Sequence, residues 1–151
     1  KSVLEKAIYK SIMIKLFYVK KDEKEFLLNN NSRAMLNFGH TIGHALESHY
    51  NYKKLNHGEA ISIGMITEAK ISNYLGLLSS NDLKRIMAHF KKYRLKMDDN
   101  ILRDKKLINK IIKDKKNFEN KIIFSLIDKI GSSSFYKKLD KNKVYKILQK
   151  I

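Results

Sequence analysis

The sequence predicts a mainly α-helical, bundle-like domain with one small β-hairpin near its C-terminus. Three observations lead to this prediction. Proline, the residue that most often ends or kinks a helix, is absent from all 151 residues. Apolar side chains recur three and four residues apart through most of the chain, as they do on the buried face of a helix. The pattern changes only in 121–127, a short β-branched run that precedes Gly131. We therefore expect residues 1–151 to form a single domain.

The apolar spacing places the elements in order along the chain. It predicts helices over 3 to about 21, 33 to about 50, from near 58 to Gly76, from a cap at Ser80 or Asn81 through 90, and 107–112. The first helix lacks a convincing N-cap, and a polar loop over 20–32 separates it from the second. Strands are expected at 121–127 and 133–137. Asp140 is a suitable cap for a last helix.

The composition is that of a folded domain and excludes several classes of protein. Hydrophobic residues make up 43% and charged residues 31% of the chain, unlike a disordered segment. No apolar run approaches the roughly 20 residues that a membrane-spanning helix needs, so no membrane partner is expected. Cysteine is absent, which removes disulfides, thiolate metal ligands and thiol nucleophiles. A cytoplasmic location fits this composition.

The strongly basic charge raises the question of nucleic-acid binding. The formal net charge is +17, but its lysines are spread along the whole chain. The chain has no zinc-finger spacing, no aromatic ribonucleoprotein signature and no compact arginine cluster. We therefore expect no nucleic-acid partner, and a positive field would instead steer a small anionic substrate toward a cleft. A stand-alone basic helical binding module without catalysis is the alternative from another functional class.

Histidines at helical spacing are the most informative feature. His40 and His44 are four residues apart and project from the same face of a helix. Gly39 and Gly43 leave space around that face, at a cost in helix propensity. His57 begins the next predicted helix, so a tight connection would bring it back beside His40. Two such imidazoles and a carboxylate would make a three-ligand zinc site with an open position.

The same residues also have ordinary interpretations. Two histidines at this spacing occur by chance, and each could be a hydrogen-bonded interior or surface residue. Arg33 and Asn37 precede the pair on the same helical face, where they could hold an anion or form a solvated helix start. His49 and His89 fit no such pattern and are read as ordinary residues. Glu47 and Glu59 are read as helix-surface acids or as outer partners of the site.

The motifs resemble the signature of 3-dehydroquinate synthases. The stretch from Arg33 to Glu47 reads Arg-x-x-Leu-Asn-Phe-Gly-His-Thr-Ile-Gly-His-Ala-Leu-Glu and is followed by His57-Gly-Glu-Ala. Lys15 with the later Asp-Glu-Lys-Glu is similar to a Lys…Asp-Glu-x-Glu segment of that family, and Asp114-Lys-Lys to its Asp-Lys-Lys segment before a hairpin. The resemblance covers nearly the entire chain, and its motifs are long and specific.

The resemblance implies a role for each matching residue. His40 and His57 would be two of the three protein ligands of a divalent metal, zinc or cobalt. His44 would sit beside the bound substrate and assist proton movement. Hydroxyl, carboxylate or phosphate groups of the substrate would be contacted by Lys15, Arg33, Asn37 and one of the pair Lys115 and Lys116.

The resemblance also implies an activity. Enzymes of this family convert the sugar phosphate 3-deoxy-D-arabino-heptulosonate 7-phosphate into 3-dehydroquinate and phosphate in the shikimate pathway. They use NAD catalytically and are commonly homodimers. Other sugar phosphate cyclases, such as 2-deoxy-scyllo-inosose synthase, and related metal-dependent polyol dehydrogenases share the histidine framework. Asn37 and the Asp-Lys-Lys segment favour the dehydroquinate-forming member.

The chain departs from the family in length and in two loops. Family enzymes are about twice as long, and their N-terminal α/β domain binds NAD and supplies a glutamate as the third metal ligand. This chain has no Gly-rich phosphate loop and no upstream candidate for that glutamate. We expect a C-terminal domain that is inactive in isolation. The connection Phe26–Ser32 is longer than usual, and Asn120 replaces a turn glycine, which its tolerance of left-handed angles permits.

Overall fold

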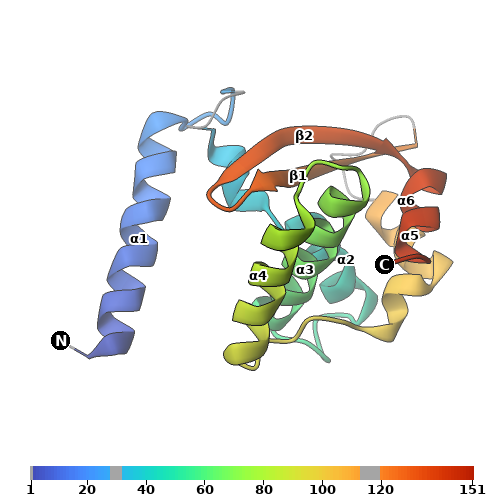
Figure 1. Ribbon diagram of the computed structural model, residues 1–151, viewed down its shortest axis with the longest axis horizontal. Helices are drawn as coiled ribbons and strands as arrows, with labels where there is room; N and C mark the ends of the chain where they lie inside the picture. The colour runs from blue at the N-terminus through green and yellow to red at the C-terminus, as the bar shows by residue number, and fades with distance from the viewer. Residues whose placement is uncertain (1, 28–31, 113–119) are drawn as a thin grey trace.

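The computed structural model describes residues 2–27, 32–112 and 120–151, and it confirms the predicted fold class. These residues form a mainly helical domain with one antiparallel hairpin near the C-terminus (Figure 1). The helices and strands are α1 Val3–Lys21, the 3-10 helix η1 Arg33–Asn37, α2 His40–His49, α3 His57–Tyr74, α4 Ser80–Lys92, the 3-10 helix η2 Asn100–Arg103, α5 Lys105–Ile112, β1 Lys121–Lys129, β2 Ser132–Asp140 and α6 Lys141–Leu148.

Side chains cap most of these helices. Contrary to expectation, α1 has a full capping box, in which Ser2 and Glu5 each accept a backbone N–H of the other. Asn56 and Glu59 form the same device at α3. The cap of α4 is Ser79, one residue before the predicted position. As predicted, Asp140 caps α6, and Gly76, at a φ of 74°, follows the end of α3.

The predicted helix over 33–50 is two elements in the structure, so that prediction was wrong. The 3-10 helix η1 ends at Asn37, and α2 begins at His40. Between them Gly39 has a φ of 86°, a left-handed angle that no helix can continue through. The apolar pattern runs across this break because both elements bury side chains, Ala34 in η1 and Ile42 in α2. Arg33 and Asn37 therefore do not share the helical face of His40.

The hydrophobic core lies between α2, α3, α5, α6 and the inner face of the hairpin. Its members come from all of these elements, and several are fully buried: Ile42, Leu46, Ile63, Leu107, Phe124 and Ile147. Alternation along β1 directs Ile122, Phe124 and Leu126 inward. This core fixes α2 and α3 against each other, and both carry the candidate site.

The hairpin joins the start of α2 to the C-terminal part of the chain. Its strands pair from Lys121 with Asp140 to Lys129 with Ser132, with two irregularities in register. Thr41 donates its hydroxyl to the Ile123 carbonyl at 3.0 Å. Ser125 donates to the Ala34 carbonyl at 2.7 Å. The hairpin thus holds both sides of the break at Gly39. Asn120, before β1, has a φ of 61°, as its place at a turn predicted.

Helix α1 stands apart from the rest of the domain (Figure 1). None of its residues is buried, and its exposed apolar side chains include Val3, Leu4, Ile8, Ile12 and Phe17. Such a face is unusual for a helix that has no further partner. No helix in the described parts of the chain is long and apolar enough to cross a bilayer.

The cap of α6 yields a direct test of the fold. The Asp140 carboxylate accepts the N–H groups of Asn142 and Lys143 at 2.8 and 3.3 Å. Asp140→Ala should lower the free energy of unfolding by about 1 kcal/mol, because those N–H groups lose their acceptor. Urea unfolding followed by circular dichroism measures the change. Asp128→Ala removes an exposed carboxylate of β1 that caps no helix, and it should have little effect. Equal effects of the two variants would contradict the capping role.

Candidate metal and substrate site

Three glycines bring α2 and α3 into backbone contact. A Cβ on Gly64 would overlap the carbonyl oxygen of Gly39, and a Cβ on Gly39 would lie 2.5 Å from Cγ of Met65. A Cβ on Gly43 would lie 2.6 Å from Cδ1 of Ile61. Real Cβ contacts are not that short, so only glycine permits this approach. The predicted space around the histidine face is therefore filled by the next helix.

This contact brings three imidazoles together. The ring centroid of His40 lies 5.2 Å from that of His44 and 5.7 Å from that of His57. The centroids of His44 and His57 are 6.2 Å apart. His57 is the first residue of α3, held by the capping box at Asn56. The expectation that His57 returns beside His40 agrees with this geometry.

Two of the three rings are oriented by oxygen acceptors. Nδ1 of His57 lies 3.0 Å from Oε1 of Glu47, and Nδ1 of His40 lies 3.4 Å from the Phe38 carbonyl. A proton on each Nδ1 makes these hydrogen bonds and leaves Nε2 with a free lone pair. His44 makes no hydrogen bond with another residue in the parts of the chain that the structure describes. Metal-binding histidines usually carry such an oxygen partner on their second nitrogen.

Burial keeps the His40 imidazole neutral at neutral pH. Desolvation is the largest influence and lowers its pKa below 6.5, and the neighbouring His44 and His57 act in the same direction. The hydrogen bond to the Phe38 carbonyl acts in the opposite direction but does not outweigh burial. A neutral ring is the form that binds a metal.

The donor atoms suit a divalent metal such as zinc or cobalt. The ligand atoms of His44, Glu47 and His57 lie within 4.8 Å of one another. The ring of His40 lies beside this group, with its centroid 5.2 Å from that of His44 and 5.7 Å from that of His57. Imidazole nitrogens with a carboxylate oxygen are the ligands that zinc prefers where thiolates are absent. Glu47 is buried, at 7% exposed, and a carboxylate in such a place is stabilised by a nearby cation.

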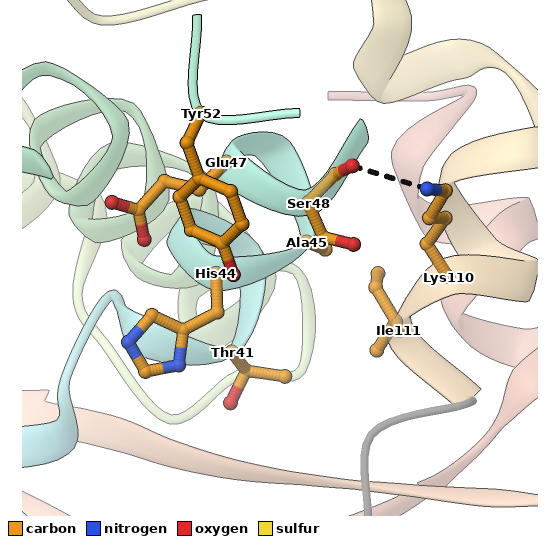
Figure 2. A pocket seen from close by; sticks show the side chains of 8 residues that line it. All are labelled: Thr41, His44, Ala45, Glu47, Ser48, Tyr52, Lys110 and Ile111. Carbon is orange, nitrogen blue, oxygen red and sulfur yellow. Dashed lines mark hydrogen bonds between the residues drawn. The ribbon is translucent and has the colours of Figure 1, made fainter. Parts of the chain in front are cut away.

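A cleft opens beside the histidines. Its volume is about 510 Å³, and it is lined by Thr41, His44, Ala45, Glu47, Ser48, Tyr52, Lys110 and Ile111. In Figure 2, His44, Glu47 and Tyr52 lie on one side, and Lys110 and Ile111 of α5 face them from the other. Lys110 donates from Nζ to the Ser48 carbonyl at 3.0 Å, at the end of α2. A small polar molecule in this cleft would contact His44 directly.

The other residues singled out from the sequence are placed differently. Arg33 donates to the Glu23 carbonyl at 3.1 Å, and Asn37 donates to Oε1 of Glu25 at 2.8 Å. Lys15 is exposed on α1, outside the histidine cluster. Lys115 and Lys116 lie outside the described residues. The structure therefore groups the histidines and attaches Arg33 and Asn37 to the loop before them.

Sequence reasoning missed two contributors to the site, Tyr52 and Lys110. It had read Glu47 as a helix-surface acid or an outer partner of the site, and the contact with Nδ1 of His57 agrees with the second reading. Tyr52 enters the cleft from a turn in which it and Asn51 have φ values of 59° and 50°. Lys110 reaches the cleft from α5 through tertiary packing, and no local pattern signals it.

Comparison with known proteins identifies the family. Residues 1–117 match the family described as 3-dehydroquinate synthase C-terminal. The chain belongs to that family. It is similar to the 3-dehydroquinate synthase of Thermodesulfovibrio yellowstonii, 43% identical over 132 residues that cover 87% of this chain and 36% of the relative. The same enzyme of Clostridium beijerinckii is 38% identical over 134 residues, which cover 86% of this chain and 36% of that protein. The chain thus spans little more than a third of these relatives.

Solved structures share the fold of this family member. A 2-deoxy-scyllo-inosose synthase complexed with carbaglucose-6-phosphate, NAD+ and Co2+ aligns with a TM-score of 0.63 at 24% identity, covering 78% of this chain and 33% of the other. A 2-epi-5-epi-valiolone synthase from Streptomyces hygroscopicus with NAD+ and Zn2+ bound gives a TM-score of 0.63 at 20% identity, covering 76% of this chain and 31% of the other. At these identities the likeness concerns the fold.

The contact between α2 and α3 predicts that position 64 tolerates no side chain larger than that of glycine. Gly64→Ala should lower the free energy of unfolding by about 1–3 kcal/mol, because the new methyl group forces α2 and α3 apart. Helix propensity alone would predict the opposite sign. Urea unfolding measures the change. Gly58→Ala is the matched control, because its Cβ would meet only Oδ1 of Asn56 at 3.5 Å. Similar stabilities of the two variants would show that the helices do not touch here.

The state of His40 predicts its titration. In the metal-free chain its pKa should lie below 6.5, because burial disfavours the charged ring. As the pH falls from 6.5, the unfolded chain binds a proton at this histidine before the folded chain does. The free energy of unfolding therefore decreases until the pH has passed the folded-state pKa. Two-dimensional NMR of the ring protons in buffer and in concentrated urea gives both values. A folded-state pKa at or above the urea value would contradict the described burial.

Proposed function

We propose that this chain is the metal- and substrate-binding part of a 3-dehydroquinate synthase. The whole enzyme would convert 3-deoxy-D-arabino-heptulosonate 7-phosphate into 3-dehydroquinate and phosphate in the shikimate pathway. The observation that carries the proposal is the convergence of His40, His44 and His57, with centroids 5.2 to 6.2 Å apart, beside a cleft. The 43% identical relative with that name supports it.

His40 and His57 are the proposed metal ligands. Both turn Nδ1 toward an oxygen and offer Nε2, which supports this assignment over one through His44. A bound zinc or cobalt ion would act as a Lewis acid on a substrate hydroxyl. His44, which lines the cleft without a hydrogen-bonding partner in the described residues, would accept or donate a proton there.

Cationic and amide side chains are proposed to bind the anionic groups of the substrate. Arg33 and Asn37 lie just before the break at Gly39, and hydrogen bonds hold both to the loop over 22–25. Lys15 belongs to the Lys…Asp-Glu-x-Glu segment, which includes that loop. One of Lys115 and Lys116 would complete the set. Guanidinium and ammonium groups bind carboxylate and phosphate through charge-assisted hydrogen bonds, which would fix a flexible sugar phosphate for reaction. The net charge of +17 would favour the approach of such a substrate.

The activity is proposed to need an N-terminal NAD-binding domain, which the relatives' greater length can accommodate. NAD would carry the hydride chemistry, and that domain would supply a carboxylate as the third metal ligand. The exposed apolar side chains of α1 support a surface that a further domain covers. We expect the 151-residue chain alone to be inactive and the complete enzyme to be a homodimer.

A different sugar phosphate cyclase is the second candidate. The shared fold with 2-deoxy-scyllo-inosose synthase favours the same general chemistry on another sugar phosphate. The sequence relatives at 38–43% identity favour the dehydroquinate-forming enzyme. A related polyol dehydrogenase would keep the metal and NAD but would release no phosphate.

A chimeric enzyme tests the proposal. This chain would replace the matching 132 residues of the Thermodesulfovibrio relative, and phosphate release from 3-deoxy-D-arabino-heptulosonate 7-phosphate would be measured with NAD and zinc. We expect turnover by the chimera. His40→Ala or His57→Ala should abolish turnover and zinc retention together, because each variant lacks a metal ligand. His49→Ala removes an imidazole that packs edge to face against Tyr50, and this variant should keep both turnover and zinc retention.

Each outcome of the chimera experiment separates the candidates. Phosphate release from a different sugar phosphate only would establish the second candidate. A folded chimera that retains zinc but releases no phosphate from any sugar phosphate would refute both cyclase assignments. Normal zinc content and turnover in His40→Ala or His57→Ala would show that the ligand assignment is wrong.

A further inference from the structure

A buried glutamate outside the histidine cluster has no role in the site as described so far. Glu68 lies in the middle of α3 and is fully buried, at 0% exposed. Burial raises its pKa, whereas backbone N–H donors to both of its oxygens favour the carboxylate form and act in the opposite direction. A carboxyl group in the interior destabilises a protein unless hydrogen bonds compensate its desolvation. Its partners therefore indicate why this position carries an acid.

All of these partners belong to the start of α2. Oε2 of Glu68 accepts the Gly39 N–H at 2.8 Å, and Oε1 accepts the Ile42 N–H at 3.2 Å. The Thr41 N–H is a third donor to the same carboxyl. The first N–H groups of a helix have no partner within it and form its positive end. Gly39, the N-cap residue of α2, has no side chain to satisfy them, so Glu68 caps α2 from the neighbouring helix.

The N–H groups that Glu68 binds lie on both sides of a proposed metal ligand in the sequence. His40 lies between Gly39 and Thr41, within the turn whose N–H groups the carboxylate binds. Glu68 and His57 belong to the same helix α3, at its middle and at its first residue. The carboxylate therefore ties the turn that bears His40 to the helix that bears His57. The glycine contact limits how close the two helices come, and the cap limits how far α2 rotates or slides.

We propose that Glu68 is a positioning residue, which caps α2 across the helix contact and holds His40 and His44 at their observed distances from His57. The consequence for metal affinity rests on the proposed function, whereas the cap itself does not. Glu68 does not touch the metal or the substrate in this proposal. It acts through the backbone of Gly39, Thr41 and Ile42.

Cobalt titration of the 151-residue chain tests the consequence for the site. The absorption bands of Co2+ report both its affinity and its ligand geometry. Glu68→Gln keeps the side-chain volume, but its amide has one acceptor oxygen and directs an NH2 group at a backbone N–H. We expect cobalt binding to weaken by about 10-fold or more, the range found for partners that orient metal ligands, together with a changed band pattern.

Ser72→Ala is the matched control for general destabilisation. Ser72 is fully buried one turn further along α3, and its hydroxyl donates to the Glu68 carbonyl at 2.9 Å without reaching α2. It should lower stability but leave the cobalt affinity and bands of the folded chain unchanged. Equal cobalt binding by wild type and folded Glu68→Gln would overturn the positioning role. Equal weakening in Ser72→Ala would assign the effect to stability alone and would also overturn it.

Amide hydrogen exchange of the wild-type chain tests the cap without any metal or variant. The N–H groups of Gly39, Thr41 and Ile42 should exchange far more slowly than free helix-end amides, because the carboxylate binds them in the interior. Exchange at the rate of an unstructured peptide would refute the cap even if Glu68→Gln fails to fold. Slow exchange in a wild-type chain that binds no cobalt would keep the cap and refute its positioning role at a metal site of this chain. The proposed function would then be decided separately, by the chimera.

Discussion

The backbone contact between α2 and α3 is the constraint on which the rest of the structure depends. Gly39, Gly43 and Gly64 allow the two helices to approach more closely than any side chain would permit. Because His40 and His44 stand on one helix and His57 begins the other, the helix separation sets the distances within the cluster. Glycine lowers the stability of a helix, and this is the cost of allowing α2 and α3, and with them the three histidines, to lie close together.

Two acidic side chains, Glu47 and Glu68, hold the histidines close together in different ways. Glu47 binds Nδ1 of His57 and so orients a ring. Glu68 binds backbone N–H groups and so orients a helix. Both are buried, which strengthens their hydrogen bonds and makes an unpaired state costly. The histidine cluster is therefore held by groups that do not need to contact a substrate, and His44 is left available to the cleft.

Much of the fold could be predicted from the sequence, because periodicity and capping residues are local signals. The spacing located α1, α3 and the hairpin, and Asp140 and Asn120 were identified from their side-chain chemistry. The break at Gly39 was missed, since apolar spacing carries no information on a left-handed angle between two buried segments.

The site was predictable to the extent that its residues share a motif. The histidines lie close in sequence, and their convergence needed only a tight turn between two helices. Lys110, Tyr52 and Glu68 act through contacts between elements far apart in the chain, so no local pattern identifies them. The pairing of Asn37 with Glu25 likewise depends on how the preceding loop folds back.

The hydrogen bonds from the hairpin to the start of α2 have a consequence for the order of folding. They join residues 82 and 91 positions apart, Thr41 with Ile123 and Ala34 with Ser125. Contacts of such separation form late, because closing a long loop costs chain entropy before any bond is gained. During synthesis, a ribosome-bound chain that ends before β1 has all three histidines but not the support for the turn that positions them. The turn at the start of α2 therefore gains these two hydrogen bonds only after β1 has emerged.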